Sequence, residues 1–211
     1  FFARRVWRMR RQAADARELD ALAAALRAAK HPLLIAGGGV LYSGAETVLG
    51  EFARRCGLPV AETQAGKGAL PWNHACALGS IGVTGSSAAN AAAAQADLVV
   101  GIGTRLADFT TGSRTLFPQA RTFQVNVQAH DAHKHGAEPV VGDAREVLVA
   151  LAAALGDWRC GAIENHRAAV AGWNAAVDAA TAGEPARTQP SDAQVIGAVQ
   201  RALGDDAIVV C

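Results

Sequence analysis

The residues best suited to bind a ligand follow short apolar segments. Gly37-Gly38-Gly39 comes directly after the apolar run 33–36 and before a helical pattern. A turn without side chains lets backbone N–H groups approach a ribose or a phosphate, and a helix N-terminus adds a positive dipole end. The match to the dinucleotide fingerprint G-x-G-x-x-G is incomplete, because Tyr42 stands at its third glycine position. Nucleotide binding and a purely structural turn are both compatible with these glycines.

A second candidate group is the segment Gln64-Ala65-Gly66-Lys67-Gly68. It lacks the spacing of a phosphate loop, because glycine and no hydroxyl residue follows Lys67. A glycine-flanked lysine can still contact an anionic group, although a flexible surface lysine is an equally good interpretation. Glu62, just before this segment, stands where a dinucleotide fold places its ribose-binding acid, or it is a solvated loop residue.

Two further groups end later apolar runs. In Gly103-Thr104-Arg105 the guanidinium could hold a phosphate or carboxylate through two hydrogen bonds. Asp108 and Arg114 are near enough in sequence to tie Arg105 into a structural ion-pair cluster instead. The run 122–127 carries the chain to Asn126-Val127-Gln128, whose amides complete the polar set.

The histidines of the sequence HDAHKH, at His130, His133 and His135, favour a solvated surface over a metal site. Metal ligands need a rigid spacing such as i, i+4 on a helix, whereas this stretch is expected in a loop. No Ser-His-Asp set, Cys-His set or G-x-S-x-G elbow is evident. The sequence therefore predicts neither a metal ligand nor a catalytic residue in this chain.

Alternating elements should position these groups. Short apolar strands are expected at 33–36, 60–61, 98–102, 122–127 and 140–141. Helices are expected at 15–30, before the terminating Gly57, from Ser86 or Ser87 to Gln95, and after a capping box at Asp143-x-x-Glu146, while 63–85 reads as irregular. This order predicts an α/β fold, a doubly wound parallel sheet of about five or six strands with helices on both faces. Ligands bind beyond the carboxyl ends of such strands, which brings residues 37–39, 62–67, 103–105 and 126–128 to one rim.

Composition excludes several classes of partner. The chain has 211 residues, of which 51% are hydrophobic, and a formal net charge of +1. Neither nucleic acid nor a membrane surface is attracted by such a charge, and no apolar run approaches the roughly 18 residues of a spanning helix. The four cysteines are far apart, which is typical of reduced thiols in a cytoplasmic protein.

The chain divides into four expected parts. Residues 1–14 form an arginine-rich linker from a preceding domain, and 15–157 form the α/β domain. Residues 158–190 hold a helix and a Pro/Gly/Ala linker. Residues 191–211, a helix capped by Ser191 and a strand at 207–211, begin a further domain. We therefore expect an internal fragment of a longer enzyme.

Four sequence blocks carry a family resemblance over about residues 15–155. They are LLIAGGG (33–39), GLPVAETQAGKGALP (57–71), LGSIGVTGSSAANAAAAQADLVVGIGTRLADFTTG (78–112) and the stretch 123–143. Together they resemble the central domain of thiamine-diphosphate-dependent enzymes related to acetohydroxyacid synthase, a DHS-like NAD/FAD-binding-domain fold. Within this family, ETQAGKGALPW (62–72), TRLADFTTGSRTLF (104–117) and KHGA (134–137) are similar to the trihydroxycyclohexane-1,2-dione hydrolases of myo-inositol catabolism.

The resemblance implies a function for a full-length parent. That enzyme would cleave a ring C–C bond of its small-molecule substrate with water, using thiamine diphosphate and Mg²⁺ held by domains outside this chain. It would be a homodimer or homotetramer, because the family's thiamine sites form between subunits. This fragment alone would be inactive.

The resemblance also implies roles at the rim. The central domain binds FAD or ADP in some family members and is empty in others, and NAD is a further candidate. The positions that correspond to nucleotide contacts are Gly37, Gly38, Gly39, Gly103, Thr104, Arg105, Asn126 and Gln128. Flavin-binding relatives carry acidic residues where this chain has 126–128, which disfavours FAD. Gln64, Lys67 and Gly68 correspond to a loop that leans toward the active site, with Lys67 as the expected substrate-side contact.

Three alternatives stay open. The parent could be a carboligase or decarboxylase of the same superfamily, either acetolactate synthase-like or a malonic semialdehyde decarboxylase. The chain could be a free-standing NAD- or nucleotide-binding module. It could also be a scaffold that holds two thiamine-binding domains in register.

Overall fold

The computed structural model describes residues 10–184, 189–204 and 207 of the chain. The chain separates into two compact units, residues 1–167 and residues 168–211, and each is described by itself. The predicted strand at 207–211 lies outside the described residues, apart from Ala207. In the described part of the chain, no helix combines the length and the apolar character needed to cross a membrane.

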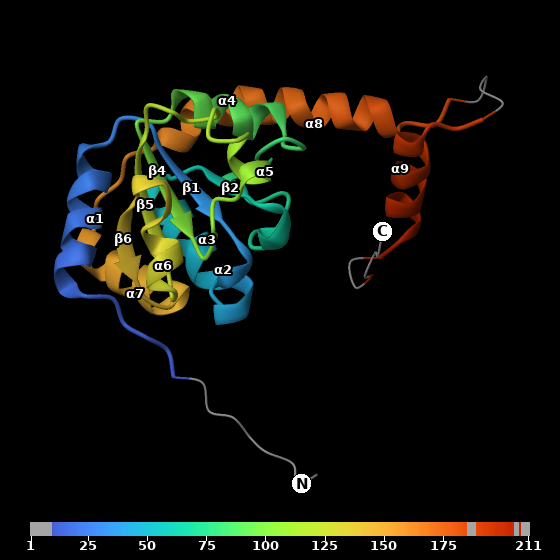
Figure 1. Cartoon of the computed structure of the whole chain (residues 1–211). Coiled ribbons are helices and arrows are strands. Elements are labelled where there is room, and N and C mark those ends of the chain that lie inside the picture. Colours follow the sequence, from blue (N-terminus) through green and yellow to red (C-terminus); the bar gives the residue numbers. More distant parts are fainter. Residues whose placement is uncertain (1–9, 185–188, 205–206, 208–211) are drawn as a thin grey trace, which may run out of the picture. The chain divides into compact units, whose positions relative to one another are not determined.

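The first unit is built on a six-stranded, all-parallel sheet (Figure 1). Its spatial order is β3-β2-β1-β4-β5-β6. The strands are β1 Pro32–Ala36, β2 Val60–Glu62, β3 Ala77–Ser80, β4 Leu98–Ile102, β5 Arg121–Asn126 and β6 Glu138–Val141. After β1 the chain adds β2 and β3 on one side of the sheet, and after β4 it adds β5 and β6 on the other side. The direction in which strands are added therefore reverses between β1 and β4. This doubly wound arrangement confirms the predicted fold.

Helices cover both faces of this sheet. The helices α1 (Ala16–Ala28), α3 (Glu46–Cys56) and α7 (Ala144–Leu155) pack side by side as one layer. Because parallel crossovers are right-handed and the chain winds in opposite directions on the two sides of β1, α4 (Ser87–Gln95) lies on the other face. Short helices complete the loops: α2 Gly38–Ser43, η1 Gln64–Gly66, α5 Asp108–Thr111, α6 Ala129–Ala132, η2 Lys134–Gly136 and η3 Ala162–His166.

The expected helix starts and stops are largely confirmed. Asp15 and Ser86 cap α1 and α4 through side-chain oxygens that accept backbone N–H groups, and Gly57 ends α3 in the left-handed conformation. The capping box at Asp143 is only half formed. Its carboxylate accepts from the first turn of α7, but its own N–H donates to the carbonyl of Gln12 and not to Glu146.

One expectation was wrong in the loops. The segment 63–85 contains the edge strand β3, which pairs with β2 through a register shift at Val60/Ala61. Its sequence, ALGS, holds a glycine at φ +84° and lacks a long apolar run, so no periodicity reveals it. The glycine triplet does lead from a strand into a helix, as expected, and α2 already begins inside it at Gly38.

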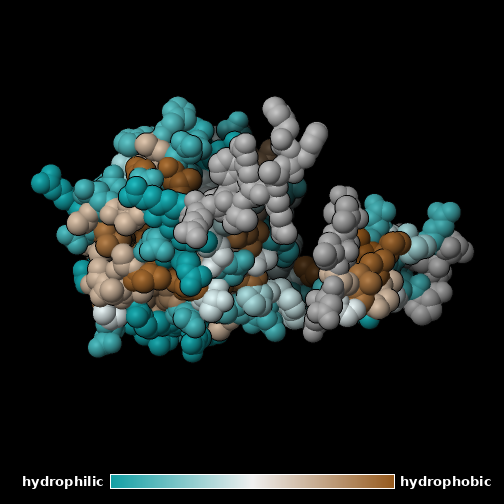
Figure 2. All heavy atoms as spheres, turned by 90° about the horizontal axis from the view of Figure 1, so that it is seen from below, coloured by the Kyte–Doolittle hydropathy of each residue, from teal (hydrophilic) through white to brown (hydrophobic). Residues whose placement is uncertain are grey.

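Two helices account for most of the described residues of the second unit. The helix α8 spans Arg167–Thr181 and crosses the boundary between the units, and α9 spans Asp192–Ala202. Ser191 and Gln194 form the reciprocal capping box at the start of α9, as the sequence indicates. Apolar side chains on α9 are exposed, and Figure 2 shows apolar patches among hydrophilic residues on both units.

Candidate functional site

The predicted rim exists, because the parallel strands end at one edge of the sheet. The turn after β1 is tied directly to the turn after β4. Gly37 donates its N–H to the carbonyl of Ile102 at 2.8 Å, and Gly39 donates to the carbonyl of Gly103 at 2.9 Å. Residues separated by more than sixty positions in the sequence therefore form one joint at the point where the direction of winding reverses.

The glycines of this joint are needed for close backbone packing. A Cβ atom at Gly37 would lie 2.4 Å from the carbonyl oxygen of Gly103, and one at Gly39 would lie 2.6 Å from the Cα atom of Gly103. The close approach that these glycines permit is to the protein's own backbone. The structural interpretation is thus sufficient to explain Gly37 and Gly39.

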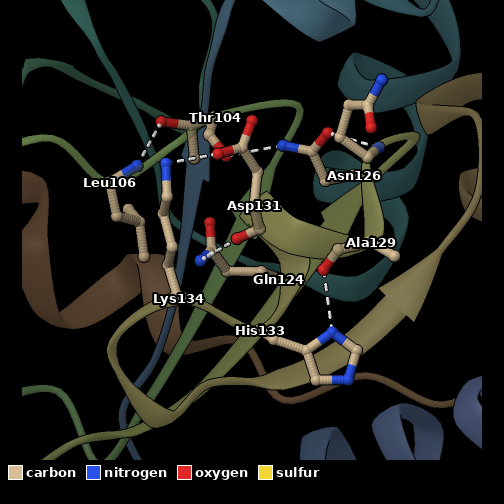
Figure 3. A network of polar contacts seen from close by, with 9 residues as sticks. Thr104, Leu106, Gln124, Asn126, Ala129, Asp131, His133 and Lys134 are labelled. Carbon is tan, nitrogen blue, oxygen red and sulfur yellow. Dashed lines mark hydrogen bonds and ion pairs between the residues drawn. The ribbon is translucent and has the colours of Figure 1, made fainter.

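Asn126 links the ends of β4 and β5 (Figure 3). Its amide nitrogen donates to the carbonyl of Thr104 at 3.0 Å, and its amide oxygen accepts from the N–H of Gln128 at 3.0 Å. The hydroxyl of Thr104 accepts from the N–H of Leu106 at 3.2 Å. Asn126 and Thr104 are both buried, so these polar groups are committed to joining the loops.

Arg105 and Gln128 are exposed polar side chains at the ends of β4 and β5. Among the described residues Arg105 has no carboxylate within salt-bridge distance, so the proposed ion pair with Asp108 does not form. An exposed guanidinium beside the ends of β1 and β4 can still meet an anion from solvent or from another part of a longer chain.

A buried amide lies next to this network. Gln124 is fully buried in β5; its Nε2 donates to the carbonyl of Asp131 at 2.9 Å, while its Oε1 has no hydrogen-bond partner. Asp131 forms an ion pair with Lys134 (Figure 3). These contacts hold α6 against β5 and place the predicted histidine cluster on the outside.

The histidines at 130, 133 and 135 are exposed, as the sequence indicates. The Nδ1 atom of His133 lies 2.8 Å from the carbonyl of Ala129, within its own turn. The described ranges hold no group of three His, Cys, Asp or Glu side chains that could bind a metal ion.

Glu62 is neither solvated nor free to meet a ribose. It is 4% exposed, and its Oε1 accepts the N–H of Leu70 at 2.8 Å. Next to it, the hydroxyl of Thr63 accepts the N–H of Gly66 at 3.0 Å. The carboxylate therefore folds the segment 63–70 back on the end of β2, and this positions Lys67.

The predicted substrate-side residues lie on the surface of that segment. Gln64, Lys67 and Gly68 are exposed, and the first two line a cavity of about 170 Å³. The other lining residues come from two further loops: Ser80, Ile81, Thr84, Phe109 and Thr110. The side chain of Phe109 is 67% exposed, and its carbonyl accepts the N–H of Val83 at 2.9 Å.

Sequence reasoning missed Phe109 and Val83. Their loops come together only because β2, β3 and β4 end at the same edge. The sequence carries no distinct signal for them, because the same loops hold other large apolar residues, such as Ile81, Leu106 and Phe117.

His74 anchors the far end of the same segment. Its Nδ1 accepts the N–H of Cys76 at 3.2 Å, and burial, with a smaller contribution from Arg54, lowers its pKa below the ordinary 6.5. Burial and the nearby His31 lower the pKa of His166 in the same way. Folding therefore favours the neutral form of both imidazoles.

These two histidines predict a loss of stability in mild acid. The folded state binds their protons less tightly than the unfolded state does, so their contribution is complete above pH about 6.5 and is lost as the pH falls below it. We expect the urea midpoint to fall between pH of about 7.5 and 5.5, and His166→Gln to flatten this slope. His130→Gln, at an exposed position, is the control. Equal slopes for all three proteins would contradict this assignment.

Comparison with known proteins matches this fold to one family. The family model described as "Thiamine pyrophosphate enzyme, central domain" matches residues 19–151. The chain belongs to this family. The expected central-domain resemblance is thereby confirmed, and the match covers the whole parallel sheet, from the strand β1 to the strand β6.

Two curated relatives that match this central domain carry the same name. The 3D-(3,5/4)-trihydroxycyclohexane-1,2-dione hydrolase of Geobacillus thermodenitrificans is 47% identical over 158 residues, which cover 75% of this chain and 25% of the relative. The protein of the same name from Shouchella clausii is 42% identical over 161 residues, again 75% and 25% of the two chains. This chain spans about a quarter of the length of these relatives.

A solved structure supports the fold independently. A protein from Mycobacterium smegmatis, described as a thiamin diphosphate-dependent enzyme, superposes with a TM-score of 0.58 at 24% sequence identity. The superposition covers 73% of this chain and 30% of that protein.

Proposed function

We propose that this chain is the central domain of a thiamine-diphosphate-dependent hydrolase that opens the ring of trihydroxycyclohexane-1,2-dione in myo-inositol catabolism. The observation that carries the proposal is the 42–47% identity, over about three quarters of the chain, to proteins named as that hydrolase. No comparable observation favours a carboligase or a decarboxylase.

Thiamine diphosphate, held with Mg²⁺, would supply the electron sink for C–C bond cleavage. The family resemblance implies that both would be held by other domains of the parent. The contribution of this chain is to position groups. The hydrogen bond from Leu70 to Glu62 holds the segment 63–70, and Lys67 of this segment lines the same cavity as the exposed Phe109. Lys67 would orient a hydroxyl or carbonyl oxygen of the substrate.

We propose that the rim between β1 and β4 serves mainly as a structural joint. Its buried side chains, Thr104 and Asn126, already have partners within the chain, which supports this role. Binding of FAD, ADP or NAD there stays a prediction, with Arg105 and Gln128 as the exposed groups. Titration of the chain with ADP and with FAD tests it. Saturable binding that Arg105→Ala weakens would favour the nucleotide alternative.

We further propose that the parent is a cytoplasmic homodimer or homotetramer. The described cysteines, Cys56, Cys76 and Cys160, are free thiols, which suits a reducing compartment. The family resemblance supports the oligomer, since thiamine sites form between subunits. Sedimentation of the full-length protein measures its size.

The decisive experiment uses the full-length enzyme with thiamine diphosphate, Mg²⁺ and trihydroxycyclohexane-1,2-dione. Ring opening that depends on the cofactor supports the hydrolase. Condensation or decarboxylation of a 2-oxo acid, without ring opening, would replace the substrate and keep the family.

Lys67→Ala in that enzyme should lower kcat/KM by about 10- to 100-fold, because the substrate loses an orienting contact. Its fold should be unaffected, since the Lys67 side chain is exposed. Lys30→Ala removes another exposed lysine, outside the cavity, and should change nothing. Equal activity of the two variants would remove Lys67 from the substrate site.

A further inference from the structure

A second and larger cavity lies on the other side of Lys67. Its volume is about 620 Å³, and it opens between the outer face of α3 and the segment 67–74. The side chains that matter for its chemistry are Glu46, Thr47, Glu51, Arg54, Lys67 and Trp72. The name "α3 cavity" is used for this site below.

The walls of the α3 cavity are fixed by hydrogen bonds. Oε1 of Glu62 accepts the N–H of Leu70 at 2.8 Å, and Nδ1 of His74 accepts the N–H of Cys76 at 3.2 Å. A Cβ atom at Gly50 of α3 would stand only 3.4 Å from Nε2 of His74, so the helix and the segment are in close contact there. A ligand would therefore meet a pre-formed site and not a loose loop.

The charges of the α3 cavity are balanced but unpaired. Two carboxylates (Glu46 and Glu51) and two cations (Arg54 and Lys67) line it. Within the described part of the chain, none of the four lies within 4.0 Å of an opposite charge, although four ion pairs form elsewhere. Acceptors and donors are thus both available. For a charged ligand, the attraction to one pair is offset by the repulsion from the other pair, so the cavity favours no net ligand charge.

Trp72 adds a flat apolar surface. Its side chain is 74% exposed, although it follows the cavity-lining residues Leu70 and Pro71. An indole can cover the C–H face of a saturated ring, while the polar groups around it hydrogen-bond to substituents at the ring edge. A neutral ring with several hydroxyl groups satisfies both requirements.

We propose that the α3 cavity binds a neutral cyclic polyol. The preference for a neutral ligand follows from the balanced charges of the cavity, and the preference for a ring follows from the exposed indole of Trp72. The choice of a cyclic polyol, as opposed to another neutral hydrogen-bonding ring, rests on the proposed function, whose substrate is a polyhydroxylated six-membered ring. The site is separate from the smaller cavity at Phe109, and Lys67 lines both.

The test measures the binding of myo-inositol, as the probe, to the 211-residue chain. Saturation-transfer NMR detects the bound ligand. We expect saturable binding that weakens at least about tenfold in Trp72→Ala and in Glu51→Gln. Tyr42→Ala removes another exposed aromatic side chain, 88% exposed and outside the cavity, and should bind like the unchanged protein. Urea unfolding of each variant shows that the fold is retained.

No saturable binding by the unchanged chain, or equal binding by Trp72→Ala and Tyr42→Ala, would overturn the proposal. Tighter binding of an amino- or carboxylate-substituted ring than of myo-inositol would overturn the assignment of a neutral ligand. The measurement needs neither thiamine diphosphate nor turnover. Its failure is therefore distinguishable from a failure of the hydrolase proposal, which the ring-opening assay decides.

Discussion

Replacing Phe123 by alanine is expected to lower the free energy of unfolding by about 3–5 kcal/mol. Phe123 is among the largest fully buried side chains, at 1% exposure in the middle of β5, and its backbone lies between Val100 of β4 and Glu138 of β6. Truncation removes the transfer free energy of the ring and leaves a cavity in a sheet whose strands cannot close around it.

Urea unfolding followed by circular dichroism measures this loss. Phe109→Ala is the matched control, since it removes the same side chain from a position that is 67% exposed. The control should unfold within about 0.5 kcal/mol of the unchanged protein. Similar losses for the two variants would contradict the assignment of Phe123 to the core.

Replacing Gly66 by alanine should cost about 2–4 kcal/mol, which overpacking against a rigid backbone can reach. A Cβ atom there would lie 2.2 Å from the carbonyl oxygen of Ala36 at the end of β1. The obstacle is backbone, so no side chain can turn away to relieve it. The segment that carries Lys67 would have to lift from the sheet, and the activity of the full-length enzyme should fall with it.

Gly44→Ala separates steric overlap from backbone strain. Gly44 has a φ of +61°, and a Cβ atom there would meet open space. Its replacement by alanine therefore costs only the free energy of placing an L-residue in the left-handed conformation. We expect about 1 kcal/mol for this control. If the Gly66 and Gly44 variants lost the same stability and activity, close packing of the segment 63–70 against β1 would not be the reason for the glycine.

The sequence by itself determined the architecture, because its signals are local. Four apolar runs become the central strands β1, β2, β4 and β5, and the helix ends follow from single residues. Ser86 accepts the N–H of Ala89 three residues later, and Gly57 takes up the left-handed conformation that L-residues avoid. Such interactions are decided within one turn of chain, so their patterns can be read without knowing the fold.

Only the tertiary structure decided which polar side chains at the carboxyl edge of the sheet are available to a ligand. The burial of Glu62 depends on the N–H of Leu70, eight residues later, and the linkage of Asn126 to Thr104 joins two different loops. The α3 cavity needs a helix and a loop that lie on opposite sides of β2 in the sequence. Whether a polar side chain is free or committed depends on partners that only the packed sheet brings near it, and no periodicity records them.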